Sequence, residues 1–147
     1  FSLLELIITL AILSVLVVAV VPLTKNNLRR QREYELKQTL REIRQAIDRY
    51  HADAVGGKIS PLDIEVNTEF YPKTLEVLVE GVSANGSPRK LRYLRRLPRD
   101  PITGKEEWGF RSIQDDPKSD SWGGQNVFDV YSKSEETALN GTKYKDW

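Results

Sequence analysis

The sequence predicts an α+β fold: a long N-terminal α-helix, transmembrane in its first half and amphipathic in its second, packed on a small antiparallel β-sheet with a loop-rich C-terminal tail. Three observations support this prediction. An almost uninterrupted apolar run occupies residues 1–23. Apolar residues then recur every three or four positions, and two segments rich in aromatic and β-branched residues follow near the end. We therefore divide the 147 residues into a hydrophobic helix, 1–23, and a head, 24–147, which includes the amphipathic helix 24–54.

The apolar run is long enough to cross a membrane. Only Ser2, Glu5, Thr9 and Ser14 interrupt it, and 23 residues at about 1.5 Å each span roughly 35 Å. Inside lipid the backbone must satisfy its own hydrogen bonds, so the run is expected to be helical despite its many β-branched residues. A secretory signal peptide would have a basic first part and a shorter apolar core. A plain single-pass anchor remains an alternative.

Glu5 is the one charged side chain in the run. A carboxylate inside an apolar helix costs about 2.5–3.5 kcal/mol on membrane-insertion scales, so it usually has a functional reason. Glu5 lies one helical turn from Phe1, and a free amine there on a neighbouring copy could neutralise it. Such pairing would favour staggered packing of neighbouring helices. A glutamate near the membrane boundary could also reach the interface alone, which leaves the plain anchor open.

The amphipathic half continues the helix beyond Pro22. We expect one helix from near residue 2 to about Ala54, ending before Gly56 and Gly57. Its apolar stripe predicts a face that packs on the head, and its mixed charges predict a solvated face. The stripe consists of Leu36, Leu40, Ile43, Ile47 and Tyr50; the charged face consists of Arg32, Glu35, Arg41, Glu42, Arg44 and Asp48.

Shorter elements follow the long helix. Residues 56–71 have the composition of a loop, residues 74–79 predict a brief helix capped by Thr74, and residues 83–88 predict a turn. Residues 107–112 and 127–132 predict strands separated by a polar loop. A small antiparallel sheet of two to four strands laid on the helix would bury the apolar stripe.

The composition argues against an enzyme. Without cysteine the chain has no disulfide, thiolate metal site or cysteine nucleophile, and a lone histidine, His51, provides no catalytic relay. Asp115, Asp116, Asp120 and Asp129 match no calcium-binding helix-loop-helix spacing and are interpreted as solvated loop residues.

Charge also bears on partners. The net charge is +1, which gives no general attraction to nucleic acid. Residues 89–96 combine five cations with an aromatic residue, a pattern also found in nucleic-acid patches. We nevertheless expect no nucleic-acid partner. Lys25, Arg29, Arg30 and Arg32 follow the apolar run, and the positive-inside rule alone would place that side of the membrane in the cytoplasm.

The first residues resemble a known family. Phe1-Ser2-Leu3-Leu4-Glu5-Leu6 is similar to the start of mature type IV pilins and of type II secretion pseudopilins, in which F-T-L-x-E-L precedes an apolar helix. The resemblance implies that a prepilin peptidase frees and methylates the amine of Phe1. Pro22 stands where the family has a proline, which bends the helix. Many members have a glycine near position 14, where this chain has Ser14.

Two further segments resemble the major pseudopilins. Residues 71–75 are similar to their Y-P-x-T-L, and residues 93–101 are similar to Y-L-x-x-L-P-x-D-P, which leads into the first strand of the sheet. The resemblance implies a subunit held in the bacterial inner membrane with a periplasmic head, on the side opposite to that favoured by the positive-inside rule. Such subunits polymerise through the N-terminal helix into a filament that drives export of folded proteins. The filament lies in the periplasm and can also extend outside the cell.

The resemblance also implies partners and site residues. The partners are further copies of the chain, minor pseudopilins, the inner-membrane assembly platform and the prepilin peptidase. Phe1 and Glu5 would set the register of the filament, and Pro22 would bend its helix. One alternative is a type IV pilin for adhesion, motility or DNA uptake, although such pilins usually have larger heads and often a C-terminal disulfide. Another is a membrane anchor whose head binds a partner, which predicts no filament and no effect of losing Glu5.

The tail raises the question of calcium. In major pseudopilins the segment after the last strand binds calcium through carboxylates and carbonyls, and calcium takes six to eight oxygens. The candidate side chains here are Glu135, Asn140 and Asp146. The alternative, which we favour, is a tail fixed by packing of Trp147 and Leu139 without a metal.

Overall fold

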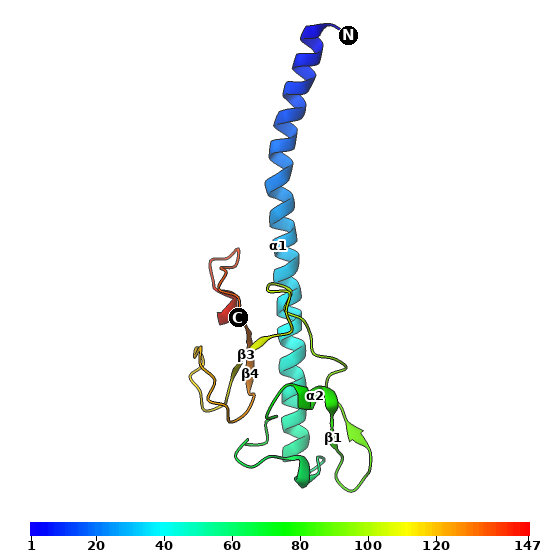
Figure 1. Cartoon of the computed structure of the whole chain (residues 1–147), viewed down its shortest axis with the longest axis vertical. Helices are drawn as coiled ribbons and strands as arrows, with labels where there is room; N and C mark the ends of the chain where they lie inside the picture. The colour runs from blue at the N-terminus through cyan, green and yellow to red at the C-terminus, as the bar shows by residue number, and fades with distance from the viewer.

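The computed structural model describes residues 1–147 as one long helix with a small head around its C-terminal half (Figure 1). Helix α1 runs over Leu3–Val55, 53 residues, or about 80 Å at 1.5 Å per residue. Its N-terminal half projects away from the rest of the chain. The predicted α+β fold is confirmed, and so is the single long helix.

Local signals account for both ends of α1. The Ser2 hydroxyl accepts a hydrogen bond from the main-chain N–H of Glu5 at 3.2 Å, as an N-cap does. At the other end Gly57 has a φ of 69°, a left-handed conformation that glycine adopts without steric cost. The helix therefore ends at the glycine pair, as predicted.

The apolar stripe of α1 forms the centre of the core. All five predicted residues are buried. Their partners come from the later elements of the head, so the second half of α1 is the scaffold on which the head folds. These partners include Leu75, Leu78, Leu94, Trp108, Val127, Val130 and Tyr144.

Helix α2 spans Glu76–Glu80 and begins two residues later than predicted. Leu75 precedes it, and no side chain caps it, so the capping role predicted for Thr74 is wrong. Leu75 is fully buried in the core. Packing of this residue, rather than a hydroxyl cap, fixes where the helix begins. Gly81, with a φ of 85°, ends it.

The strands form two separate two-stranded sheets instead of the single sheet predicted. In the first, β1 (Val82–Ser83) and β2 (Lys90–Leu91) are antiparallel across the predicted turn. In the second, β3 (Trp108–Arg111) and β4 (Asp129–Ser132) are antiparallel, and β4 lies against α1 (Figure 1). Both strands of the second sheet are shorter than predicted.

Two prolines lie in the segment between the two sheets. Pro98 and Pro101 lie between β2 and β3, and proline cannot donate to a strand ladder. The segment 93–101 was expected to lead into the first strand, but β1 and β2 precede it. In the second sheet the Tyr131 ring covers Gly109, where an added Cβ would lie 2.3 Å from ring carbons. Two short 3₁₀ helices complete the head: η1 (Pro61–Asp63) and η2 (Tyr144–Asp146).

Candidate assembly helix and tail network

The first half of α1 has no partner within the chain. Residues 1–28 are exposed, and their large apolar side chains are between 49% and 104% exposed. The most apolar window of 18 residues has a mean hydropathy of 3.0. This one helix is long and apolar enough to cross a membrane, and its whole surface is open to lipid or to neighbouring helices.

Glu5 is the one charged side chain on this apolar surface. The hydroxyls of Thr9 and Ser14 donate to the main-chain carbonyls of Leu6 and Leu10 at 2.9 and 2.8 Å, so they are satisfied within the helix. The Glu5 carboxylate is exposed and has no ion pair within the chain. In a dry environment it therefore needs a counter-charge from outside this copy.

Phe1 and Pro22 also lie on the exposed half. Helix α1 is continuous across Pro22, but proline has no N–H, so the carbonyl of Val18 loses its helical hydrogen bond. Pro22 is 17 residues beyond Glu5, which is about 26 Å along the helix. The structure thus places Glu5 and Pro22 on α1 and Phe1 just before it, and Pro22 is far from the other two. Any joint role requires contacts between copies.

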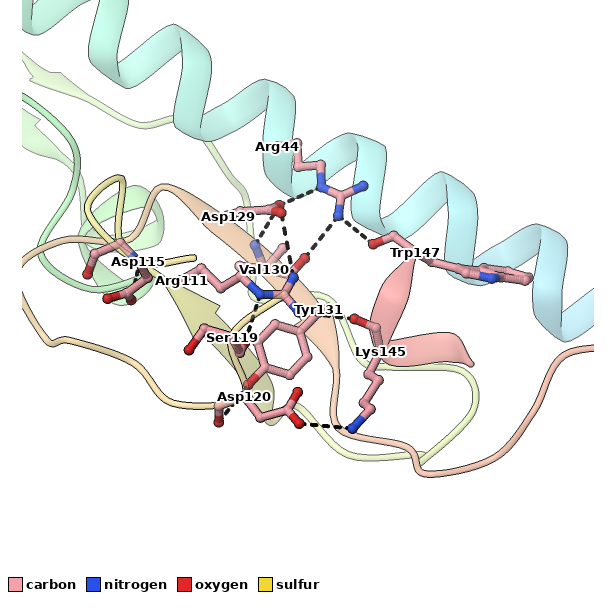
Figure 2. A network of polar contacts seen from close by, with 11 residues as sticks. Arg44, Arg111, Asp115, Ser119, Asp120, Asp129, Val130, Tyr131, Lys145 and Trp147 are labelled. Atoms are coloured by element: carbon pink, nitrogen blue, oxygen red, sulfur yellow. Dashed lines mark hydrogen bonds and ion pairs between the residues drawn. The ribbon is translucent and has the colours of Figure 1, made fainter. Parts of the chain in front are cut away.

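A polar network ties the tail to α1 and β4 (Figure 2). Arg44 Nε donates to Asp129 Oδ1 at 2.7 Å, and Arg44 Nη2 donates to the main-chain carbonyls of Val130 at 3.2 Å and Trp147 at 2.7 Å. Side chains of Arg44 and Asp129 are only 36% and 27% exposed. Two predictions are corrected here: Arg44 is not on a solvated face, and Asp129 is not a solvated loop residue. Asp129 begins β4, within the strand predicted over 127–132.

Arg111 is the buried cation of this network. Its side chain is 6% exposed, and it donates to the carbonyls of Ser119 at 2.9 Å and Lys145 at 3.2 Å. The guanidinium lies 4.1 Å from the centre of the Tyr131 ring, and its Nη1 lies 3.9 Å from Asp129 Oδ2. It therefore joins β3, the following loop and the tail.

Two loop aspartates that were predicted to be solvated accept hydrogen bonds within the head, although Asp120 is 62% exposed. Asp115 Oδ2 accepts hydrogen bonds from the main-chain N–H groups of Gly123 at 3.0 Å and Ser112 at 2.8 Å, and these bonds lower the pKa of Asp115. Asp120 accepts a hydrogen bond from Lys145 Nζ at 2.9 Å, which lowers the pKa of Asp120. Both carboxylates hold the polar loop in place.

A second set of contacts fastens the tail closer to the apolar half of α1. Glu33 Oε1 accepts hydrogen bonds from the Tyr144 hydroxyl at 2.9 Å and from the main-chain N–H of Leu139 at 2.8 Å. Arg29, one turn earlier, donates to the carbonyl of Thr137. Burial raises the pKa of Tyr144. Arg29 and Glu33, one helical turn apart and opposite in charge, thus hold the tail on both sides of the loop between Thr137 and Tyr144.

The candidate calcium ligands all lie in the tail, but the side chains of Glu135 and Asn140 contact different partners within the chain. Glu135 Oε2 lies 3.9 Å from Lys145 Nζ. Asn140 Oδ1 accepts hydrogen bonds from the N–H and the hydroxyl of Thr142, at 3.1 and 2.6 Å. Asp146 lies in η2. No group of three or more histidine, cysteine and acidic side chains is placed to hold a metal ion. Calcium also binds amide and main-chain oxygens, so calcium binding by the tail stays a prediction.

Packing of the tail differs from the alternative prediction at one residue. Trp147 packs against the core, with its ring 5.1 Å from that of Tyr144 and 4.6 Å from Lys37 Nζ. Leu139 is 41% exposed, so the packing role predicted for its side chain is wrong. Its main-chain bond to Glu33 holds this part of the tail instead.

Arg111 and Lys145 were missed by the sequence analysis as anchors of the tail. A signal was present for Arg111, because it belongs to a short strand with Trp108 and Phe110. Charged residues are rarely buried unless they are paired, so an arginine in such a strand indicates a hidden acceptor. His51, near the end of α1 as predicted, stacks on the Tyr71 ring with centroids 4.1 Å apart.

Compared with family models, curated proteins and solved structures, the chain matches none.

Proposed function

We propose that this chain is a structural subunit that polymerises through the apolar half of α1 into a type II secretion pseudopilus. The observation that carries the proposal is an unpartnered apolar helix with a single unpaired carboxylate near its start. Residues 1–28 are exposed, and Glu5 has no ion pair within the chain. A plain anchor needs the apolar surface but gains nothing from a carboxylate that costs about 2.5–3.5 kcal/mol.

Assembly supplies what a single copy lacks. The sequence resemblance implies a free amine at Phe1, and that amine on a neighbouring copy is the counter-charge that we propose for Glu5. An ion pair sheltered among apolar helices fixes their register, because any slip would leave both charges unpaired. The surrounding leucine, isoleucine and valine side chains then form the dry core of the filament.

Storage in the membrane precedes assembly in this proposal. The apolar half of α1 has two dry environments available, lipid and the filament core, and moving between them requires pulling the helix out of the bilayer. This step is uphill, which fits the ATP-driven assembly platform that the resemblance implies. The head stays in the periplasm and is displayed on the outside of the filament.

The test is the protein profile of culture supernatants from a strain that lacks this chain. The strain is complemented with the wild type, with Glu5→Ala, or with the matched control Glu65→Ala, whose carboxylate is exposed at the far end of the head. We expect secreted enzymes to disappear in the deletion strain and to return with the wild type and with Glu65→Ala, but not with Glu5→Ala.

Two outcomes would contradict the proposal. If Glu5→Ala restores secretion fully, the helix is a plain anchor. If secretion never changes while surface fibres, motility or DNA uptake are lost, the chain is a type IV pilin. The mass of the N-terminal peptide independently tests whether the Phe1 amine is free and methylated.

A further inference from the structure

We infer that Lys25, Arg29 and Arg32 bind the phosphate of an anionic phospholipid headgroup at the membrane surface. The spacing of these residues, i, i+4 and i+7, places them on one face of α1. The inference goes beyond assembly, because it requires only that the apolar half of α1 lies in a bilayer.

The three cations line a cleft between α1 and the tail. Its volume is about 720 Å³, and Leu28 provides an apolar part of its lining. Two tail carboxylates, Glu135 and Glu136, also line it. Three cations therefore face two carboxylates in the lining, and Glu33 Oε1 lies 4.0 Å from Arg29 Nε. Because carboxylates already offset part of this positive charge, the cleft suits the single negative charge of a phosphodiester better than a dianion.

Donors in the cleft remain free. Lys25 and Arg32 are exposed, and no hydrogen bond or ion pair within the chain uses their side chains. Arg29 gives Nε to the Tyr144 hydroxyl and Nη2 to the Thr137 carbonyl. These contacts hold the guanidinium in place and leave its Nη1 available, since a guanidinium carries five N–H donors in a fixed fork. The tail thus pre-orients the central cation.

The cleft begins within the headgroup layer and extends beyond it. Residues 3–23 span roughly 32 Å, close to the hydrocarbon thickness of about 30 Å. Lys25 then lies about 3 Å beyond the lipid core, Arg29 about 9 Å and Arg32 about 14 Å. The headgroup layer is roughly 5–8 Å thick. Helical side chains lean toward the N-terminus, which here means back toward the membrane, so the long basic side chains reach the phosphates.

With the periplasmic head of the proposed function, lipid binding also accounts for cations on this side of the membrane, an argument that rests on that proposal. The positive-inside rule disfavours Lys and Arg beside a segment whose head is translocated. An anionic headgroup in the cleft offsets that positive charge. Each Lys or Arg near an anionic surface strengthens binding about fivefold.

The test uses the full chain in neutral detergent micelles, with bound lipid counted by native mass spectrometry. The chain is titrated with dioctanoyl phosphatidylglycerol, dioctanoyl phosphatidylcholine or inorganic phosphate. The variant is Lys25→Gln with Arg32→Gln. The matched control is Arg92→Gln with Arg95→Gln, which removes two exposed cations without side-chain partners from another part of the head.

We expect phosphatidylglycerol to bind at least about tenfold more tightly than phosphatidylcholine. The affinity of the Lys25/Arg32 variant for phosphatidylglycerol should be at least about tenfold lower than that of the wild type. The control should bind like the wild type. An equal loss in the control would show unspecific attraction and overturn the inference, as would equal binding of the two lipids. Inorganic phosphate that binds as tightly as phosphatidylglycerol would identify a small-anion site instead and also overturn it. Because the readout is lipid binding, failure here leaves the secretion test of the proposed function untouched.

Discussion

Asp129 is the residue on which the polar network of the head converges. It accepts a hydrogen bond from Arg44 and lies 3.9 Å from the buried Arg111 guanidinium. For Asp129→Asn we expect the free energy of unfolding to fall by roughly 2 kcal/mol, because a charge-assisted bond is lost and a buried cation loses its counter-charge. Urea denaturation of the full chain in detergent, followed by tryptophan fluorescence, measures this loss.

Asp116→Asn is the matched control for that measurement. Asp116 is exposed, so its replacement removes the same charge without breaking the network. We expect a change within about 0.5 kcal/mol. Equal losses in the two variants would mean that net charge, rather than the network, supports the tail.

Acid should weaken the head through two aspartates. The hydrogen bond from the main-chain N–H of Gly123 is the largest cause that lowers the pKa of Asp115. The hydrogen bond from Lys145 lowers the pKa of Asp120. Because these pKa values are lower in the folded state, the stabilisation is present above the unfolded value near 3.9 and is lost as pH falls through the folded value. We expect Tm to fall below about pH 4, less steeply in Asp115→Asn than in Asp116→Asn. A Tm that rises on acidification would refute this.

At the scale of residues, the sequence predicted where important side chains lie better than what they contact. Glu5 could be singled out because the residues that make it unusual, the apolar run, are its neighbours in the sequence. The acceptors of Arg44 and Arg111 lie far along the chain, so neither propensity nor periodicity reveals them. For the same reason the hydrogen bonds of Asp115, Asp120 and Asp129 were not predicted, whereas Asp116 is exposed as predicted. The assembly partner of Glu5 stays a prediction.

Among the elements, the second half of α1 bears most of the packing. Leu36 is fully buried, whereas Leu62 in η1 is 94% exposed. We expect Leu36→Ala to lower the free energy of unfolding by about 2–5 kcal/mol, from lost burial and the cavity left behind. Leu62→Ala, the same chemical change, should cost less than about 0.5 kcal/mol. Denaturation of both variants by urea compares them directly, and a similar cost at both sites would mean that the stripe is not the core.

Pro22 should leave a weak point in the apolar half of α1. In Pro22→Ala the new N–H donates to the Val18 carbonyl, restoring one helical hydrogen bond. We expect slower amide exchange over residues 18–26 in micelles, measured by hydrogen–deuterium exchange with peptide mass spectrometry. Val20→Ala, which changes a side chain without adding a donor, should leave exchange nearly unchanged. Unchanged exchange in Pro22→Ala would show that the proline does not weaken the helix.

The elements also show what sequence can predict. Helix α1 was predicted to within about a residue at each end, because the apolar run, the apolar stripe and the glycine pair are local signals. The split into two sheets was missed, because strands of two and four residues depend on packing rather than on their own pattern. Likewise burial of Leu75, not the nearby threonine, sets the start of α2.

The whole molecule separates two tasks along one helix. The apolar half projects from the head with no contact from later segments, whereas the tail returns to the middle of α1 (Figure 1). Contacts from Arg29, Glu33 and Arg44 fasten the tail to the middle of α1 and keep the head compact. Under the proposed function, the apolar half exchanges lipid for neighbouring helices without unfolding of the head.

The central claim, assembly through Glu5, is tested most directly by negative-stain electron microscopy of filaments formed when the chain is overproduced with its assembly system. The wild type is compared with Glu5→Gln and Glu65→Gln, each checked for equal amounts in the membrane fraction. Filaments from the wild type and Glu65→Gln, and none from Glu5→Gln, are the result that the account predicts. Filaments of normal number and length from Glu5→Gln would contradict it.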